Sequence, residues 1–178
     1  MTTSQPGARD KPDMRMLDQM PDCRPEWAVH PQAIPLQLSP ASKGTSDLVN
    51  HISNIEIVRW IDRAAELALT AAGWSYQDLL DTRSMFFVAR HEIDYRSEAL
   101  PDETFLIATW VRDIRRVKSW RDTLIWTMRE ETPEVVCTAS TLWVHVDLDT
   151  RKPTRIPDEM STALLPLQDE DSPWRARA

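Results

Sequence analysis

The sequence predicts an α+β fold in which a five-stranded antiparallel sheet wraps around one long central helix. One long segment has the 3.6-residue spacing of an amphipathic helix, and the segments on either side alternate with the two-residue period of strands. The 178-residue chain is 42% hydrophobic and 28% charged, which is typical of one globular domain with a sizeable core. We expect this domain over residues 27–160, between a mobile leader at 1–26 and a tail at 161–178.

The first expected elements are a short strand and the central helix. The strand is AIPLQL at residues 33–38, whose prolines suit an edge position. The helix follows, with Ser53 and Glu56 spaced as a capping box at its start and Gly73 as a left-handed stop at its end. Its apolar residues form two neighbouring stripes, which predict a helix covered on most sides: Ile55, Val58, Ile61, Ala65, Ala68 and Ala72, and Ile57, Trp60, Ala64, Leu67 and Ala71.

Four further segments have the alternation and the β-branched and aromatic content of strands, and short turns separate them. The strands are expected within residues 85–97, 104–120, 121–131 and 134–149, with turns at 100–103, 119–122 and 131–134. Because several strands are apolar on both faces, the sheet needs a cover on its second face as well. With one long helix available, we expect a second subunit as that cover, hence a homodimer or homotetramer, and one short helix after Arg155.

Composition excludes several functional classes. The net charge of -7 argues against general nucleic-acid binding. No apolar run approaches the roughly 18 residues of a membrane span, and the first residues lack the apolar core of a secretory signal. Cys23 lies in a polar segment and Cys137 in an apolar one, which favours free thiols in a reducing cytoplasm. No metal-ligand spacing occurs, and no metal or other cofactor is expected.

Polar side chains gather where the helix begins, at Asp47, Asn50, His51, Ser53 and Asn54. Such residues commonly cap a helix or form a turn, and a histidine there is commonly a structural hydrogen-bonding group. Since Ser53 is already suited to the capping role, Asp47 and His51 are also candidates for a reaction site. Asn54 is expected to hold the loop.

These residues carry a resemblance to a known family. The run Asp47–Asn54 resembles the motif D-x-x-G-H-V-N-N of the 4-hydroxybenzoyl-CoA thioesterase family, and it is also similar to a segment of plant acyl-ACP thioesterases. Three later stretches resemble the same family, namely residues 92–95, 101–103 and 141–157. The resemblance covers about residues 30–160 and implies the hotdog fold, a sheet wrapped around a helix. Asn50 stands where glycine is commonest in the motif, and Ser53 replaces its first asparagine.

The resemblance implies hydrolysis of an acyl-CoA or acyl-ACP thioester. It places Asp47 beside the thioester as base or nucleophile and His51 as its partner. The backbone N–H groups at the helix start, from Ile52 through Ser53 to Asn54, would stabilise the oxyanion because helix N-termini leave such donors unpaired. Trp60 is either a core residue or part of an acyl or aryl pocket.

A cluster of cations around one predicted hairpin has two interpretations. It comprises Arg112, Arg115, Arg116, Lys118 and Arg121. In one interpretation the cluster is a solvated strand end with Asp113 and Asp122 as partners. In the other it is a clamp that binds either the coenzyme A phosphates or an acidic carrier protein, formed by Arg115, Arg116, Lys118 and Arg121.

Two other functions remain open from the sequence. A hotdog hydratase or dehydratase would carry its acid and histidine one residue further apart, usually with a proline between them, which the Asp47–His51 spacing disfavours. A subunit that binds an acyl thioester without turnover is compatible with the departures from the motif.

Overall fold

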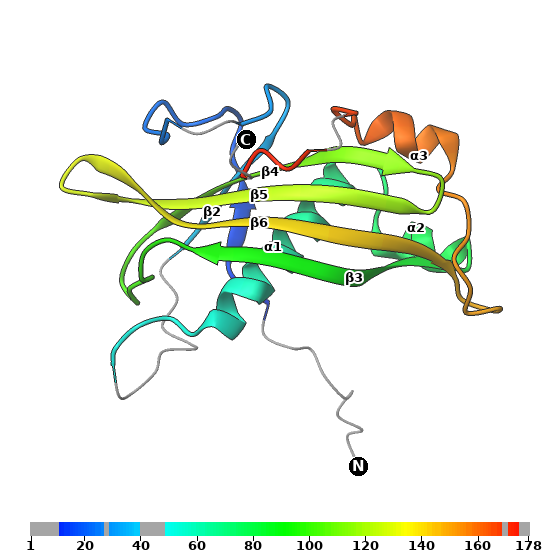
Figure 1. Cartoon of the computed structure of the whole chain (residues 1–178), viewed down its shortest axis with the longest axis horizontal. Helices are drawn as coiled ribbons and strands as arrows, with labels where there is room; N and C mark the ends of the chain where they lie inside the picture. The colour runs from blue at the N-terminus through cyan, green and yellow to red at the C-terminus, as the bar shows by residue number, and fades with distance from the viewer. Residues whose placement is uncertain (1–10, 27–28, 40–48, 169–170, 175–178) are drawn as a thin grey trace, which may run out of the picture.

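The computed structural model describes residues 11–26, 29–39, 49–168 and 171–174. In this part of the chain a six-stranded antiparallel sheet has the order β1-β2-β4-β5-β6-β3. The elements are β1 (Met14–Met16), β2 (Ile34–Leu38), α1 (Asn54–Ala71), α2 (Tyr76–Asp81), β3 (Ser84–Tyr95), β4 (Phe105–Arg115), β5 (Lys118–Arg129), β6 (Thr132–Asp147) and α3 (Asp158–Ala163). Figure 1 shows α1 lying along one face of the sheet, with α2 and α3 at one end of it. The predicted α+β architecture is confirmed.

The sheet has six strands instead of the predicted five because the chain adds β1 at one edge. Met14 pairs with Leu38 and Met16 with Leu36, and Met14 is buried. Part of the segment predicted to be a mobile leader is therefore folded. Three residues are too few to establish an alternating pattern, so this strand left no signal in the sequence.

Helix α1 has the predicted ends but is covered less completely than predicted. The Ser53 Oγ accepts a hydrogen bond from the Glu56 N–H, while the Glu56 carboxylate pairs with Arg59 at 2.5 Å, so the structure forms one half of the predicted capping box. Gly73 adopts the left-handed conformation, with φ of 88°, that stops the helix. Ile55 is 70% exposed, because α1 turns Ile57, Trp60 and Ile61 toward the core and Ile55 away from it.

Both tight hairpin turns lie a few residues away from their predicted positions. The chain turns after β4 at residues 116–117 and after β5 at residues 130–131, so residues 119–122 and 132–134 lie within strands. Arg116, Glu130 and Glu131 adopt left-handed φ angles of 47°, 48° and 65°. Turns of this kind usually contain glycine. These turns contain none, so the sequence carried no signal for their positions and the turns were predicted in the wrong place.

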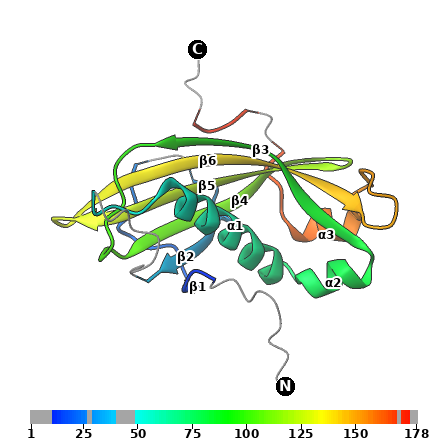
Figure 2. The same cartoon turned by 90° about the horizontal axis from the view of Figure 1, so that it is seen from below.

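The outer face of the sheet is covered by the chain's own end segments. Ala108, Trp110, Leu124 and Trp126 form an apolar cluster there with residues from both ends, including Met20 and Trp174. The Trp126 Nε1–H donates to the Cys23 carbonyl at 2.9 Å, and the Trp174 Nε1–H donates to the Ala139 carbonyl at 3.1 Å. Figure 2 shows the C-terminal segment and α1 on opposite sides of the sheet. A second subunit is thus not needed to cover this face, and the oligomeric state stays a prediction. Within the described ranges, no helix combines the length and apolarity of a membrane span.

Candidate active site

The chain reaches α1 through a tethered and conformationally unusual segment. Asn50 has a φ of 48°, in the left-handed region where asparagine is among the most tolerated residues after glycine. The Ile52 N–H donates to the Ala99 carbonyl at 2.8 Å, and the Ile52 side chain is fully buried. Asn50 therefore supplies the backbone conformation that suits a glycine at its place in the motif.

A cavity of about 330 Å³, open to solvent, lies at the start of α1. One wall comes from the entrance to the helix and includes His51, Ile52 and Asn54. The other wall is the segment after β3, from Tyr95 to Ala99. The volume falls within the range of pockets that hold small organic ligands, roughly 300–1,000 Å³. The structure thus brings His51 and Asn54 together at one hollow.

Backbone donors are available at this cavity. Of the predicted oxyanion donors, the Ile52 N–H is already bonded to the Ala99 carbonyl, so the prediction was wrong for this residue. Among the described residues, no acceptor pairs with the backbone N–H of Asn54, which lines the cavity, or of Ile55, the residue after it, whereas the N–H of Glu56 is taken up by Ser53. Unpaired N–H groups of a long helix point along its axis, and the helix dipole adds positive potential at the same end. An oxygen atom that gains negative charge would be stabilised here.

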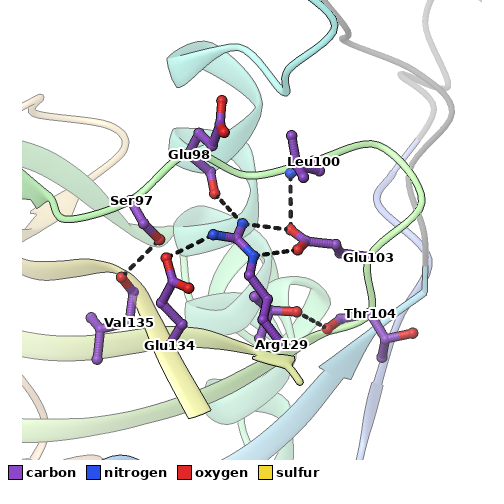
Figure 3. Close-up of polar contacts among 9 residues, drawn as sticks. Ser97, Glu98, Leu100, Glu103, Thr104, Arg129, Glu134 and Val135 are labelled. Carbon is purple, nitrogen blue, oxygen red and sulfur yellow. Dashed lines mark hydrogen bonds and ion pairs between the residues drawn. The ribbon is translucent and has the colours of Figure 1, made fainter. Parts of the chain in front are cut away.

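The wall formed by residues 95–99 is held in place by Arg129 at the end of β5. Its guanidinium donates two hydrogen bonds to the Glu103 carboxylate, at 2.6 and 3.0 Å, and one to the Glu98 carbonyl at 2.6 Å. A further bond reaches Glu134 at 2.7 Å. Figure 3 shows how these bonds join the loop before β4 to the β5–β6 hairpin.

The same loop is anchored by a second group of contacts. The Glu103 carboxylate accepts the Leu100 N–H at 3.0 Å, and Ser97 Oγ donates to the Val135 carbonyl at 3.1 Å (Figure 3). Burial would raise the pKa of Glu103, but the hydrogen bonds from Arg129 and from the Leu100 N–H outweigh it and hold that pKa below its ordinary value. Glu103 is therefore a carboxylate at neutral pH.

The acid of the motif lies outside the described residues. Asp47 belongs to residues 40–48, so its position relative to the cavity stays a prediction. Asp47 precedes His51 by four residue steps, and four extended steps span at most about 14 Å.

Trp60 and the cations lie apart from this cavity. Trp60 is buried and packs against Phe105, with ring centroids 4.8 Å apart, in the core between α1 and the sheet. Arg115, Arg116 and Lys118 are exposed at the β4–β5 turn, where Arg115 pairs with Asp113. That turn is separated from the first residue of β4, near the cavity wall, by ten residue steps, or about 33 Å. Within one chain the structure does not bring these cations to His51, and their role as a phosphate clamp stays a prediction.

The remaining two cations of the cluster are buried. Arg112 pairs with Asp122 at 2.9 Å, and both side chains are inaccessible to solvent. Arg121 is also buried, on the helix-facing side of β5. The prediction that Arg121 belongs to a surface phosphate clamp with Arg115, Arg116 and Lys118 is therefore wrong within one chain, because Arg121 is buried.

Comparison with known proteins identifies the family. A family model described as the thioesterase-like superfamily matches residues 42–164, a span that includes Asp47 and His51. The chain belongs to the thioesterase-like superfamily. No curated protein sequence is significantly similar to it.

Solved structures of the same fold confirm the hotdog architecture of this superfamily member. A Staphylococcus aureus protein in complex with CoA has a TM-score of 0.70 and 14% identity, covering 79% of this chain and 87% of its own. A 1,4-dihydroxy-2-naphthoyl-CoA thioesterase from Synechocystis has a TM-score of 0.67 and 17% identity, covering 77% and 98%. A variant of 4-hydroxybenzoyl-CoA thioesterase in complex with 4-hydroxybenzoyl-CoA has a TM-score of 0.69 and 14% identity, covering 74% and 98%. The superfamily assignment supports the prediction of a thioester hydrolase.

Proposed function

We propose that this protein hydrolyses acyl-CoA thioesters in the cavity at the start of α1. One observation carries the proposal: in a member of the thioesterase-like superfamily, an open cavity is lined by His51 and by the first residue of a long helix, whose backbone N–H has no acceptor among the described residues. No metal or redox cofactor is part of the proposal.

The proposed chemistry assigns each group one task. Asp47 attacks the thioester carbonyl or removes a proton from the attacking water, which is worth about 10²–10⁴-fold in rate for a positioned base. The N–H groups of Asn54 and Ile55 stabilise the oxyanion, and loss of one such donor costs about 2.7–4 kcal/mol of transition-state stabilisation. His51 orients Asp47 or the carbonyl. With Asp47 as base, the water oxygen joins the carbonyl carbon, the C–S bond breaks, coenzyme A leaves as a thiolate and the acyl group leaves as a carboxylic acid. With Asp47 as nucleophile, breakage of the C–S bond releases the thiolate and leaves an acyl–Asp47 anhydride, which water then hydrolyses to the carboxylic acid and free Asp47.

The carrier and the acyl group are tested by a thiol-release screen. The panel begins with aryl-CoA thioesters, because two of the structural relatives described above are named for aryl-CoA substrates, and continues with alkyl-CoA chain lengths and acyl-ACP. Stoichiometric release of thiol and acid is expected. A change in absorbance from a C=C bond without thiol release would indicate a hydratase, and calorimetric binding without turnover would indicate a binding subunit.

A His51→Ala variant tests whether the cavity is the place of reaction. We expect kcat to fall at least tenfold while the far-ultraviolet circular dichroism is unchanged, because His51 lines the open cavity and does not belong to the apolar core. Unchanged kcat would remove His51 from the mechanism.

We also propose that the protein is a homodimer joined along β3. This strand is hydrogen-bonded to β6 on one side, and in the described residues its other edge has no neighbour. Phe87, Val88 and Tyr95 on it are 45%, 39% and 43% exposed, and Tyr95 also lines the cavity. Exposed apolar edges of this length favour pairing with another strand. Sedimentation velocity should give a dimer, and a monomer at micromolar concentration would refute the proposal.

A further inference from the structure

A buried arginine that forms no ion pair with a described residue lies at the opposite end of α1 from the candidate active site, and the charge of the neighbouring Asp122 acts on it without a direct contact. Arg121 is 6% exposed and projects from β5 toward α1. With the described residues it forms one side-chain hydrogen bond, a long one from Nη1 to the Thr109 Oγ1 at 3.4 Å. Among the described residues no carboxylate forms an ion pair with it, since the adjacent Asp122 pairs with Arg112 and bonds Ser140. A buried guanidinium in this state carries a large desolvation cost.

Two neighbouring cavities meet at Arg121. The larger, of about 140 Å³, lies beside the last turns of α1 and is bordered by Ala68, Ala72, Trp110 and Val111. The smaller, of about 30 Å³, lies toward α2 and is bordered by Leu69, Phe86 and Trp143. Arg121 and Leu164 line both. An apolar cavity of about 150 Å³ is large enough to hold a benzene ring.

The polar groups around the smaller cavity are predominantly hydrogen-bond donors. Trp143 is 8% exposed, lines the cavity, and its Nε1–H is buried without a hydrogen-bond partner. Tyr76 and Ser119, which carry hydroxyl groups, line the same cavity. Burial and the nearby charges of Asp62 and Glu66 raise the pKa of Tyr76 to about 12, so its hydroxyl keeps its proton. No acidic side chain lines either cavity.

A positive charge, an orphan N–H and two hydroxyl groups next to an apolar hollow form a site for an amphipathic anion. A carboxylate would accept hydrogen bonds from Arg121 and from the Trp143 N–H, and an apolar body of about ring size would occupy the larger cavity. Inorganic anions would satisfy the charge but leave the apolar volume empty.

We propose that the cavities at Arg121 bind a small monocarboxylic acid with an aromatic or branched aliphatic body. This site lies near the C-terminal end of α1, whereas the cavity at His51 lies at its N-terminal end. The helix between them is 18 residues long, or about 27 Å, so the two sites are separate. The proposal does not rest on the proposed thioesterase activity.

Calorimetry and thermal unfolding with sodium benzoate test this site on the full chain. Benzoate should bind with one site per chain, with a dissociation constant between micromolar and low millimolar, and should raise the unfolding temperature. Benzyl alcohol, which lacks the charge, and inorganic phosphate, which lacks the apolar body, should bind at least tenfold more weakly. No binding of benzoate at tens of millimolar, or phosphate binding as tight as benzoate, would overturn the proposal.

Three variants place the binding. Arg121→Met should abolish the benzoate response, and it should remain folded because it removes a buried charge that forms no ion pair with the described residues. Trp143→Phe keeps an aromatic ring but deletes the orphan N–H, and it should weaken benzoate binding about fivefold or more. The matched control Arg151→Met, at an exposed position, should bind benzoate as the wild type does. Undiminished benzoate binding by both Arg121→Met and Trp143→Phe would refute the site.

Discussion

Replacing Arg129 with methionine should loosen the wall of the candidate active site. The substitution removes four hydrogen bonds, two to the Glu103 carboxylate and one each to Glu134 and the Glu98 carbonyl. Hydrogen bonds to charged groups are worth about 1.5–3 kcal/mol each when buried, but one guanidinium makes all four and its side chain is 25% exposed. Discounted for solvent screening and non-additivity, the free energy of unfolding should fall by about 2–4 kcal/mol.

The loss of unfolding free energy in Arg129→Met should depend on pH, in a direction set by the pKa of Glu103. The pKa of Glu103 in the folded state is lowered, so its contribution to stability is present above its ordinary value of 4.5 and disappears as the pH falls through the lowered value. The difference between wild type and Arg129→Met should therefore be largest near neutral pH and shrink as the pH falls below the ordinary glutamate value of 4.5.

Urea unfolding at several pH values and steady-state thiol release together measure both effects. The Michaelis constant should rise several-fold, because residues 95–99 line the cavity and lose their anchor. The matched control is Arg155→Met, whose ion pair with Asp158 lies on the surface and should contribute less than about 1 kcal/mol. If Arg129→Met unfolds at the wild-type urea concentration with an unchanged Michaelis constant, Arg129 does not position the wall.

Two further predictions concern the rest of the molecule. Asp122→Ala removes the ion-pair partner of the buried Arg112 and should lower the free energy of unfolding by about 3–5 kcal/mol. The double variant Arg112→Met with Asp122→Leu should recover most of that loss. Equal losses for the two variants in urea titrations would contradict this prediction. Cys23 is exposed, while burial raises the pKa of the Cys137 thiol to about 12, so a thiol reagent should label one cysteine in the folded protein and two in urea. Rapid labelling of both in the native state would show that Cys137 is accessible.

Local sequence signals predicted most of the fold. The helix could be predicted because Ser53, the spacing of its apolar residues and Gly73 all indicate the same element. The long strands could be predicted because alternation persists over ten or more residues in each. The turns could not, because Arg116 and the pair Glu130–Glu131 adopt a conformation that their residue types do not indicate.

Of the two walls of the candidate active site, the sequence predicted the one at the entrance to α1. His51 and Asn54 belong to a motif read along the chain, and both line the cavity. Tyr95 and Glu98 reach it through strand pairing and the contacts of Arg129, which are tertiary and leave no pattern in the sequence. The prediction for Arg121 failed for a related reason. A cluster of cations along the chain does not reveal that the Arg121 side chain projects from β5 toward the helix.

The central claim, that an acid beside the start of α1 drives thioester hydrolysis, is tested most directly by kcat/KM for the best substrate of the panel in Asp47→Asn. The exposed Asp81→Asn on α2 is the matched control, and circular dichroism checks that each variant is folded. We expect Asp47→Asn to lose at least a hundredfold in kcat/KM while Asp81→Asn keeps the wild-type value. A folded Asp47→Asn variant that turns over substrate within a few-fold of wild type would contradict the account.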